Sequence, residues 1–330
     1  RGLGDVYKRQ YMGTITAAGN MINTGEVNAN DIYIGGIIGR LQDTQVVSVK
    51  GEIRNEGNVV GNSAMGGIVG YATDEDAKIP VMAYGDIVNQ GKLQGTISSG
   101  SASVGGILGS FDCQEGIFSE TGVIKNEGDI TANGTMVGGI GGDYAVQAST
   151  KPVQKCINTG SVTGTNNVGG LFGTANLKSS TEEYKNIENS YSTGSVTASG
   201  ESQSKVGALV GYYAGNKIKN SYHTSLYPII GTADEANGVE NCYDIEEYRG
   251  VAETEEVISK TKAEFASGEV AYLLDGTGEN RATAPVWGQN IGTDESPVLG
   301  GAAVYKDGDV YANTEHTYDV AYLSLIHISE

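Results

Sequence analysis

The sequence predicts an all-β fold, a parallel β-solenoid (β-helix) of about six to seven rungs, and three observations predict it. A two-part cassette recurs six times, aliphatic residues occupy matching columns in the copies, and glycine supplies 50 of the 330 residues. A repeat of this period is typical of chains in which each unit buries its apolar face only against its neighbours.

The cassette consists of Asn-x-Gly, an alternating stretch, and Gly-Gly-aliphatic-aliphatic-Gly. Its first glycine stands at positions 25, 57, 91, 128, 160 and 194, in steps of 32, 34, 37, 32 and 34 residues. Its last glycine stands at 39, 70, 109, 142, 173 and 211, in steps of 31, 39, 33, 31 and 38. The sixth copy has Ser192 for the Asn and Ala208 for a glycine, and the fourth has Gly141 for an aliphatic. The spacing stays near one value although some copies contain insertions. This pattern predicts strands of constant length joined by loops of variable length.

Between these landmarks polar and apolar residues alternate, which is the strand signature. Three columns of the repeat are mainly aliphatic, and β-branched side chains suit a pleated, half-buried surface. The columns read Val27, Val59, Leu93, Ile130, Val162 and Val196; Met21, Ile53, Ile87, Ile124, Cys156 and Ser190; and Ile34, Met65, Val104, Val137, Val168 and Val206. We expect these side chains to stack coil upon coil in a single dry interior.

A glycine pair before two aliphatics marks a corner or bulge, because glycine reaches positive φ and lets two backbones approach closely. The recurring Asn either stacks on its equivalents as a ladder of amide hydrogen bonds, or is an ordinary turn residue that tolerates the left-handed conformation.

Three other structural classes are disfavoured. A helical solenoid would place many glycines inside helices, where each costs about 1 kcal/mol relative to alanine. Collagen requires glycine at every third residue, and disorder does not explain the aliphatic columns. Since ordering a residue costs about 1–2 kcal/mol, one rung is not stable alone, and the stack needs caps at its ends.

The cassette fades after Gly211, and residues 216–250 are expected to form degenerate terminal rungs. Thr261 and Glu264 form a capping-box pattern that begins a single predicted helix, which Gly268 weakens and residues 275–276 (DG) end. We expect this helix to belong to a small cap over the open edge of the solenoid. Trp287, the only tryptophan, is expected to anchor a small core there, with an exposed sugar-stacking platform as the alternative.

The two ends of the chain lack the repeat pattern. Residues 1–10 and the apolar run 323–330 resemble translated linker sequence at the edges of assembled DNA, and we expect both to be non-native. The predicted organisation is therefore a solenoid over 11–250, followed by a C-terminal cap and tail region over 251–322.

Charge and cysteine content narrow the partners and the compartment. The net charge is −19, and residues 245–330 hold 16 acids against five Lys or Arg. Nucleic-acid binding is disfavoured because no basic stripe is present, and no apolar run reaches the length of a membrane helix. Cys113, Cys156 and Cys242 are too few and too widely spaced for a disulfide framework or a zinc site. We expect Cys156 to act as a small buried hydrophobe.

The sequence contains no recognised catalytic or phosphate-binding motif, and His223, His316 and His327 share none. The acidic segments 74–76 (DED) and 307–309 (DGD) lack the spaced ligands of a full calcium loop and are interpreted as solvated turns. Outward strand positions carry mainly Asn, Ser, Thr and single Glu, although stacking could bring an acid pair together. We therefore expect no catalytic, cofactor-binding or metal-binding residues and no enzyme activity in this chain.

Residues 168–173 (VGGLFG) and 191–196 (YSTGSV) resemble the GLUG motif repeats of bacterial cell-surface proteins. Residues 189–194 (NSYSTG) and 241–243 (NCY) are similar to the usual opening turn of that family, and 265–274 with 286–290 resembles the segment that often closes such arrays. The resemblance spans about residues 20–250. It implies an extracellular β-solenoid in a secreted or wall-attached protein, such as an adhesin or a very large peptidase, and it implies no catalytic residues here.

These observations favour a non-catalytic module at the bacterial cell surface that acts as a stalk or an adhesive scaffold. Its expected partner is a host or microbial surface glycan or protein. One alternative is an accessory region of a large secreted peptidase or glycosidase whose catalytic domain lies elsewhere. The other is a carbohydrate-active β-helix enzyme.

Overall fold

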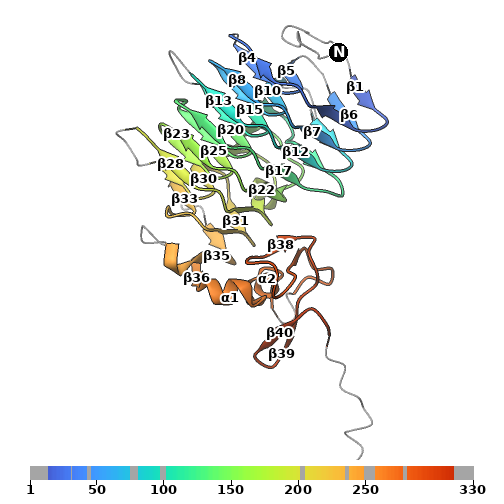
Figure 1. The fold of residues 1–330 in the computed structure, drawn as a ribbon, viewed down its shortest axis with the longest axis vertical. Helices are drawn as coiled ribbons and strands as arrows, with labels where there is room; N and C mark the ends of the chain where they lie inside the picture. Colours follow the sequence, from blue (N-terminus) through green and yellow to red (C-terminus); the bar gives the residue numbers. More distant parts are fainter. Residues whose placement is uncertain are drawn as a thin grey trace, which may run out of the picture. The chain divides into compact units, whose positions relative to one another are not determined.

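The structure, a computed structural model, describes residues 14–30, 32–42, 46–74, 81–96, 102–200, 205–234, 238–248, 257–277 and 281–315. The chain divides into two units, Arg1–Ser259 and Lys260–Glu330. The first is a parallel β-solenoid whose strands stack in sequence order, from blue to yellow in Figure 1. The predicted fold class is therefore confirmed, whereas the segments 1–10 and 323–330, predicted to be non-native, lie outside the described residues.

Each of the first six coils contains five short strands, and each strand pairs in parallel with its equivalents in neighbouring coils. The first position of the coil forms two four-stranded sheets: β1 Thr14–Ala17, β6 Val46–Val49, β11 Val81–Ala83 and β16 Phe118–Ser119, then β21 Val153–Gln154, β26 Ile187–Glu188, β31 Lys217–Lys219 and β34 Gly238–Glu240. The second position forms a nine-stranded sheet: β2 Met21–Asn23, β7 Ile53–Asn55, β12 Ile87–Asn89, β17 Ile124–Asn126, β22 Cys156–Asn158, β27 Tyr191–Ser192, β32 Tyr222–His223, β35 Cys242–Ile245 and β36 Val257–Lys260.

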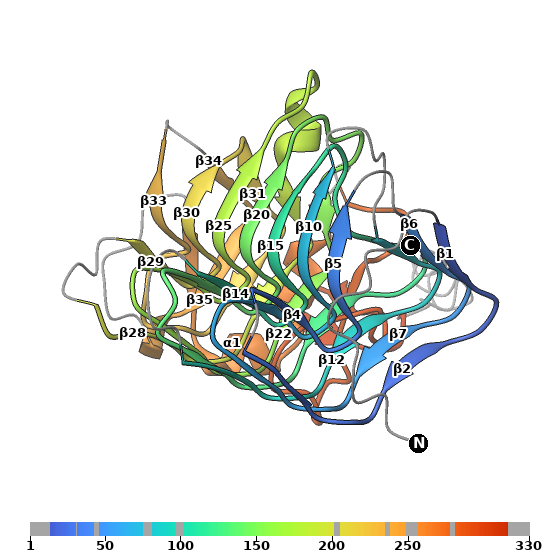
Figure 2. The same ribbon diagram turned by 90° about the horizontal axis from the view of Figure 1, so that it is seen from above.

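The remaining three positions complete the coil. The third is a six-stranded sheet: β3 Val27–Asn28, β8 Val59–Gly61, β13 Leu93–Gly95, β18 Ile130–Ala132, β23 Val162–Gly164 and β28 Val196–Ala198. The fourth is another: β4 Tyr33–Gly35, β9 Ala64–Gly66, β14 Ser103–Gly105, β19 Met136–Gly138, β24 Asn167–Gly169 and β29 Val206–Gly207. The fifth is seven-stranded: β5 Ile38–Gln42, β10 Val69–Asp74, β15 Leu108–Cys113, β20 Gly141–Val146, β25 Phe172–Leu177, β30 Val210–Ala214 and β33 Ile230–Ala233. Figure 2 shows the strands of this last sheet side by side in that order.

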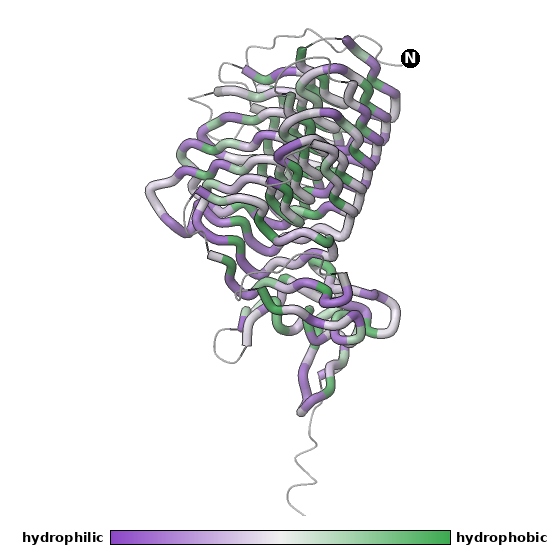
Figure 3. Tube along the Cα trace, turned by 90° about the vertical axis from the view of Figure 1, so that its left-hand side faces the viewer, coloured by the Kyte–Doolittle hydropathy of each residue, from purple (hydrophilic) through white to green (hydrophobic). Residues whose placement is uncertain are grey.

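The aliphatic columns point inward as predicted, but they line two cores rather than one. Residues from the first, second and fifth positions form the main core, which includes Val47, Ile53 and Phe111. Residues from the third and fourth positions form a second core, which includes Val59 and Met65. Figure 3 shows hydrophobic residues running through the stack of coils. The expectation of a single dry interior is therefore wrong.

A buried ladder of asparagines runs through the coils, from the second-position strands. Asn55, Asn89, Asn126 and Asn158 are each 0% exposed. Each Nδ2 of the first three donates to the Oδ1 of the next Asn at 2.8 Å and to the carbonyl of the glycine two residues on at 2.7–2.8 Å. The ladder hypothesis is confirmed, and these buried amides are satisfied only because the coils stack in register.

The glycine pairs allow that ladder to fit. A Cβ on Gly67 would stand 2.1 Å from the carbonyl oxygen of Gly106 and 2.4 Å from Cγ of Asn89. The pairs in the other coils meet the same two neighbours, with Ser192 replacing the Asn at Gly170. Among the described residues, the paired glycines are not in the positive-φ region. Close approach therefore explains them, and the positive-φ explanation is wrong.

The solenoid narrows at its C-terminal end, as the degenerate rungs over 216–250 predicted. In the seventh coil the chain passes from β32 to β33 without third- or fourth-position strands among the described residues. Tyr227 packs against the end of the second core at this point. The main core continues further, through Cys242 and Val257.

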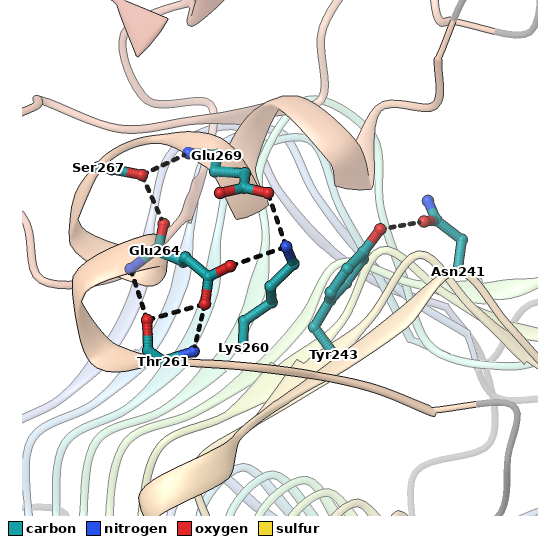
Figure 4. Close-up of polar contacts among 7 residues, drawn as sticks. All are labelled: Asn241, Tyr243, Lys260, Thr261, Glu264, Ser267 and Glu269. Atoms are coloured by element: carbon teal, nitrogen blue, oxygen red, sulfur yellow. Dashed lines mark hydrogen bonds and ion pairs between the residues drawn. The ribbon is translucent and has the colours of Figure 1, made fainter. Parts of the chain in front are cut away.

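The corner between the first and second positions changes along the stack. In the first four coils it contains a glycine, at Gly19, Gly51, Gly85 or Gly122. From β21 onward a single residue in the left-handed conformation makes the corner: Lys155 (φ 56°), Asn189 (47°), Asn220 (46°) and Asn241 (52°). Tyr243 donates to Oδ1 of Asn241 at 2.7 Å, as Figure 4 shows. Three of the four residues are Asn, which adopts the left-handed conformation at low energetic cost. Lys155 adopts it at a higher cost.

The second unit contains two short helices, α1 Lys262–Ala266 and α2 Glu269–Leu274, where one was predicted. Gly268, with φ 89°, separates them. The predicted capping box at Thr261 and Glu264 is confirmed (Figure 4). The pKa of Glu264 is lowered to about 2. The largest cause is the hydrogen bond from the Thr261 N–H, followed by those from Lys260 and the Thr261 hydroxyl. Two hairpins follow: β37 Trp287–Gly288 with β38 Val298–Leu299, and β39 Tyr305–Asp307 with β40 Val310–Ala312.

Trp287 is 1% exposed, so it anchors the core of this unit and is not a sugar-stacking platform. The Asp275 carboxylate accepts hydrogen bonds from the N–H groups of Val286 at 2.8 Å and Trp287 at 3.1 Å. That the unit covers the open edge of the solenoid stays a prediction.

Replacing Asn126 with Ala should lower the free energy of unfolding by about 2–4 kcal/mol. The substitution removes the acceptor of one Asn89 side-chain N–H and the donor to Oδ1 of Asn158, both buried. Asn23→Ala, at the half-buried first rung, is the matched control and should cost about 1 kcal/mol. Urea unfolding followed by circular dichroism measures both, and equal losses would contradict a special role for the buried ladder.

Replacing Lys155 with Asn should raise the free energy of unfolding by about 0.5–1 kcal/mol, because Asn adopts the left-handed conformation at lower cost. Lys155→Ala removes the same side chain without that advantage and should give no gain. Thermal and urea unfolding of the two variants make the comparison. A gain for Ala equal to that for Asn would refute the backbone explanation.

Candidate functional site

The seven-stranded sheet carries a row of outward side chains, one from each strand in register. In each strand the residue of the row alternates with inward core residues, so the row faces away from the core. We call it the outer row: Arg40, Tyr71, Ser110, Asp143, Thr174, Tyr212 and Thr232. All of its members are half-buried.

The fourth-position sheet borders the outer row and contributes side chains to it. Tyr33 on β4 contacts Tyr71, with ring centroids 4.2 Å apart and planes tilted by 31°. Asn167 on β24 donates from Nδ2 to Oγ1 of Thr174 at 3.2 Å. These contacts across the two sheets explain why outward residues here are half-buried rather than fully exposed.

Asp143 is the carboxylate at the middle of the outer row. Burial, and then repulsion from Asp112, raise its pKa above the ordinary value. Its carboxylate makes no hydrogen bond within the part of the chain that the structure describes. Asp129, by contrast, accepts hydrogen bonds from the hydroxyl and N–H of Ser161 at 2.8 and 3.1 Å, which lower its pKa. An uncompensated, half-buried acid is the kind of group that marks a functional surface.

Tyr212 is the second-last member of the row, and its hydroxyl donates to Asp234. That hydrogen bond, followed by desolvation, raises the pKa of Tyr212. The Lys205 ammonium lies 5.0 Å from the centroid of the same ring. A tyrosine therefore lies beside a cation at the first two members of the row and again at its sixth.

The structure aligns Ser192, His223 and Asp244 on consecutive coils, an arrangement that the sequence analysis missed. They occupy the ladder position after Asn158, whose Nδ2 donates to Oγ of Ser192 at 3.3 Å. Their exposed fractions are 0%, 1% and 2%. A serine nucleophile must be accessible to its substrate, so we assign these three residues to the end of the ladder rather than to catalysis.

The other residues singled out from the sequence take structural places. Cys113, Cys156 and Cys242 are buried free thiols, which agrees with the expectation for Cys156, and burial raises the pKa of Cys156 to about 12. The segment 307–309 forms the turn between β39 and β40. Residues 75–76, His316 and His327 lie outside the described residues. Within the described ranges, no group of three or more His, Cys, Asp or Glu side chains gathers at one place.

The outer row also escaped the sequence analysis, although a signal for it was present. Each of its first six members directly follows the last glycine of a cassette. Aligning that position would have revealed the row, whereas the contact of Tyr33 with Tyr71 depends on the angle between two sheets.

Most of the cationic side chains that the structure describes on the second-position strands lie beside a carboxylate. Arg54 contacts Glu52 at 3.0 Å and Glu56 at 3.3 Å, and Lys125 contacts Glu127 at 2.6 Å. No helix in the described part of the chain has the length and apolar character needed to cross a bilayer.

Comparison with known proteins gives one distant similarity. The chain is 28% identical over 219 residues to halomucin from Haloquadratum walsbyi. The aligned region covers 66% of this chain and 2% of halomucin, so the chain spans a very small part of that protein. No family model and no solved structure matches the chain.

Replacing Asp143 with Asn should stabilise the protein at pH 7 by about 0.5–1 kcal/mol, the size of a typical single stabilising change. Because its pKa is raised on folding, ionised Asp143 costs stability above that pKa. The gain should disappear as the pH falls below about 3.9, where the group is protonated in both states. Asp129→Asn is the control with the opposite sign, since the pKa of Asp129 is lowered. Urea unfolding between pH 3 and 8 tests the pair, and a loss of stability in Asp143→Asn at pH 7 would be the contradicting result.

Proposed function

We propose that this chain is a non-catalytic, GLUG-type repeat module of a secreted or cell-wall-attached bacterial surface protein. In this proposal it acts as a stalk and presents a binding scaffold to a host or microbial surface glycan or protein. The observation that carries the proposal is the outer row, in which successive strands place polar and aromatic side chains at a fixed spacing of about 4.8 Å.

The repetitive geometry of the row favours a repetitive partner. A polymer with regularly spaced groups meets an equivalent backbone environment on each coil, while the side chain changes from coil to coil. Inward positions are occupied by core and ladder residues, so binding chemistry is restricted to outward positions and loops.

The surface-protein part of the proposal has two supports. The sequence resembles GLUG repeats, and the distant relative is named a mucin, which loosely fits a surface-type repeat protein. A net charge of −19 also suits a soluble, hydrated module. The accessory-region alternative places the same module beside a catalytic domain and predicts the same absence of turnover in this chain.

The proposal predicts binding without turnover. The 330-residue chain, immobilised on a sensor, should retain one or more polymers from a panel of acidic and neutral polysaccharides. Released reducing ends and absorbance of unsaturated products should stay at background, with and without calcium. Reproducible shortening of a polymer would overturn the proposal in favour of a carbohydrate-active enzyme.

A further inference from the structure

The first two strands of the outer row hold a guanidinium beside two tyrosine rings that contact each other. Arg40 on β5 stands in register with Tyr71 on β10, and Tyr33 on β4 completes the group. The guanidinium carbon of Arg40 lies 5.1 Å from the ring centroid of Tyr33 and 5.6 Å from that of Tyr71. We call Tyr33, Arg40 and Tyr71 the Tyr–Arg–Tyr cluster.

The rings orient the cation but do not neutralise it. Cation–π contacts attract a guanidinium to a ring face, whereas a carboxylate would bind its N–H groups directly. Among the described residues no carboxylate pairs with Arg40, and its buried Nε makes no hydrogen bond. Arg54, on β7, also has a buried Nε without a hydrogen bond, but it differs from Arg40 because its guanidinium contacts two glutamates.

An arginine whose side chain is fixed by packing, and whose charge has no acid partner, is prepared for an external anion. The planar fork binds carboxylate or sulfate through two parallel hydrogen bonds, and holding it in place reduces the entropy lost on binding. Tyr33 and Tyr71 each also carry a hydroxyl that can donate a hydrogen bond. The positive charge is complementary to an anion even though the chain as a whole is acidic.

We propose that the Tyr–Arg–Tyr cluster is an anion subsite for an acidic polysaccharide, one carrying carboxylate or sulfate groups. The polymer runs across the strands along the outer row, with its anionic group on Arg40 and its hydroxyls near Ser110 and Thr174. Asp143 disfavours a second anionic group at the middle of the row, so the row selects polymers whose charges are spaced apart. This inference rests on the proposed binding function and names the ligand class for it.

The test measures binding of hyaluronate, which carries a carboxylate on every second sugar, and of a sparsely sulfated dextran to the full chain, with uncharged dextran as the neutral probe. Wild type should bind one or both acidic polymers, more weakly as salt increases, and should not bind dextran. Arg40→Gln should weaken that binding by about tenfold or more, typical of losing a charged bidentate contact. Arg54→Gln, which removes an arginine already paired with glutamates, is the matched control and should stay within about twofold of wild type.

A second variant distinguishes the loss of the subsite from a loss of folding. Arg40→Lys keeps the charge and the apolar stem but loses the fork, so it should give an intermediate loss of binding while circular dichroism and the melting temperature match wild type. Equal losses in the Arg40 and Arg54 variants, or an Arg40→Gln affinity within about twofold of wild type, would refute the subsite. Arg40-dependent binding to phosphatidylserine vesicles, without binding to either polymer, would assign the site to a lipid surface instead.

The outcomes separate this inference from the proposed function. Cleavage of a polymer would overturn the proposed function. Binding that does not depend on Arg40 would overturn the subsite alone and leave the scaffold role intact. Binding to neither acidic polymer would overturn the subsite and leave only a stalk or a different partner.

Discussion

The contact between a buried asparagine and a glycine of the neighbouring coil is the constraint on which this solenoid depends. The asparagine amide is satisfied only by the next rung and by its own turn, so it requires coils stacked in register. The facing glycine leaves no room for a Cβ, since one on Gly106 would stand 2.4 Å from Cγ of Asn126. A slip of one residue would turn every core side chain outward and leave buried amides unpaired, so the ladder and the cores specify the same register.

The division into two cores explains how the coil can change shape along the stack. The ladder lies on the second-position strands, whose other inward residues belong to the main core. The third and fourth positions enclose their own core and can end after the sixth coil, where Tyr227 packs against it. The ladder position passes to Ser192, His223 and Asp244, so the amide series ends one coil before the third and fourth positions do. The main core continues because it does not need the missing strands.

The sequence was sufficient for features that repeat at a fixed spacing. The aliphatic columns and the degenerate rungs after Gly211 follow from alternation and period, which are local. The period aligns the asparagines, but it does not decide between a ladder and a turn residue. The two cores do not, because alternation gives the face of a strand but not which strands lie opposite it. The sequence predicts one helix weakened at Gly268, whereas the left-handed backbone of Gly268 separates two helices. The Tyr–Arg–Tyr cluster was missed because Tyr33 and Tyr71 come from different coils and different sheets.

The outer row is the part of the molecule in which sequence can vary without disturbing the fold. Inward positions must match the residue above and below in size, and the ladder must match in hydrogen bonding. A residue directly after the last cassette glycine meets neither demand, so an arginine, tyrosine, serine, aspartate or threonine fits the same backbone. A purely structural surface has no reason to retain a half-buried carboxylate without a hydrogen bond, because desolvation makes its ionised form costly. Asp143 therefore adds a negative charge to the row, two strands from Tyr71, and in the proposed subsite this charge disfavours a second anionic group.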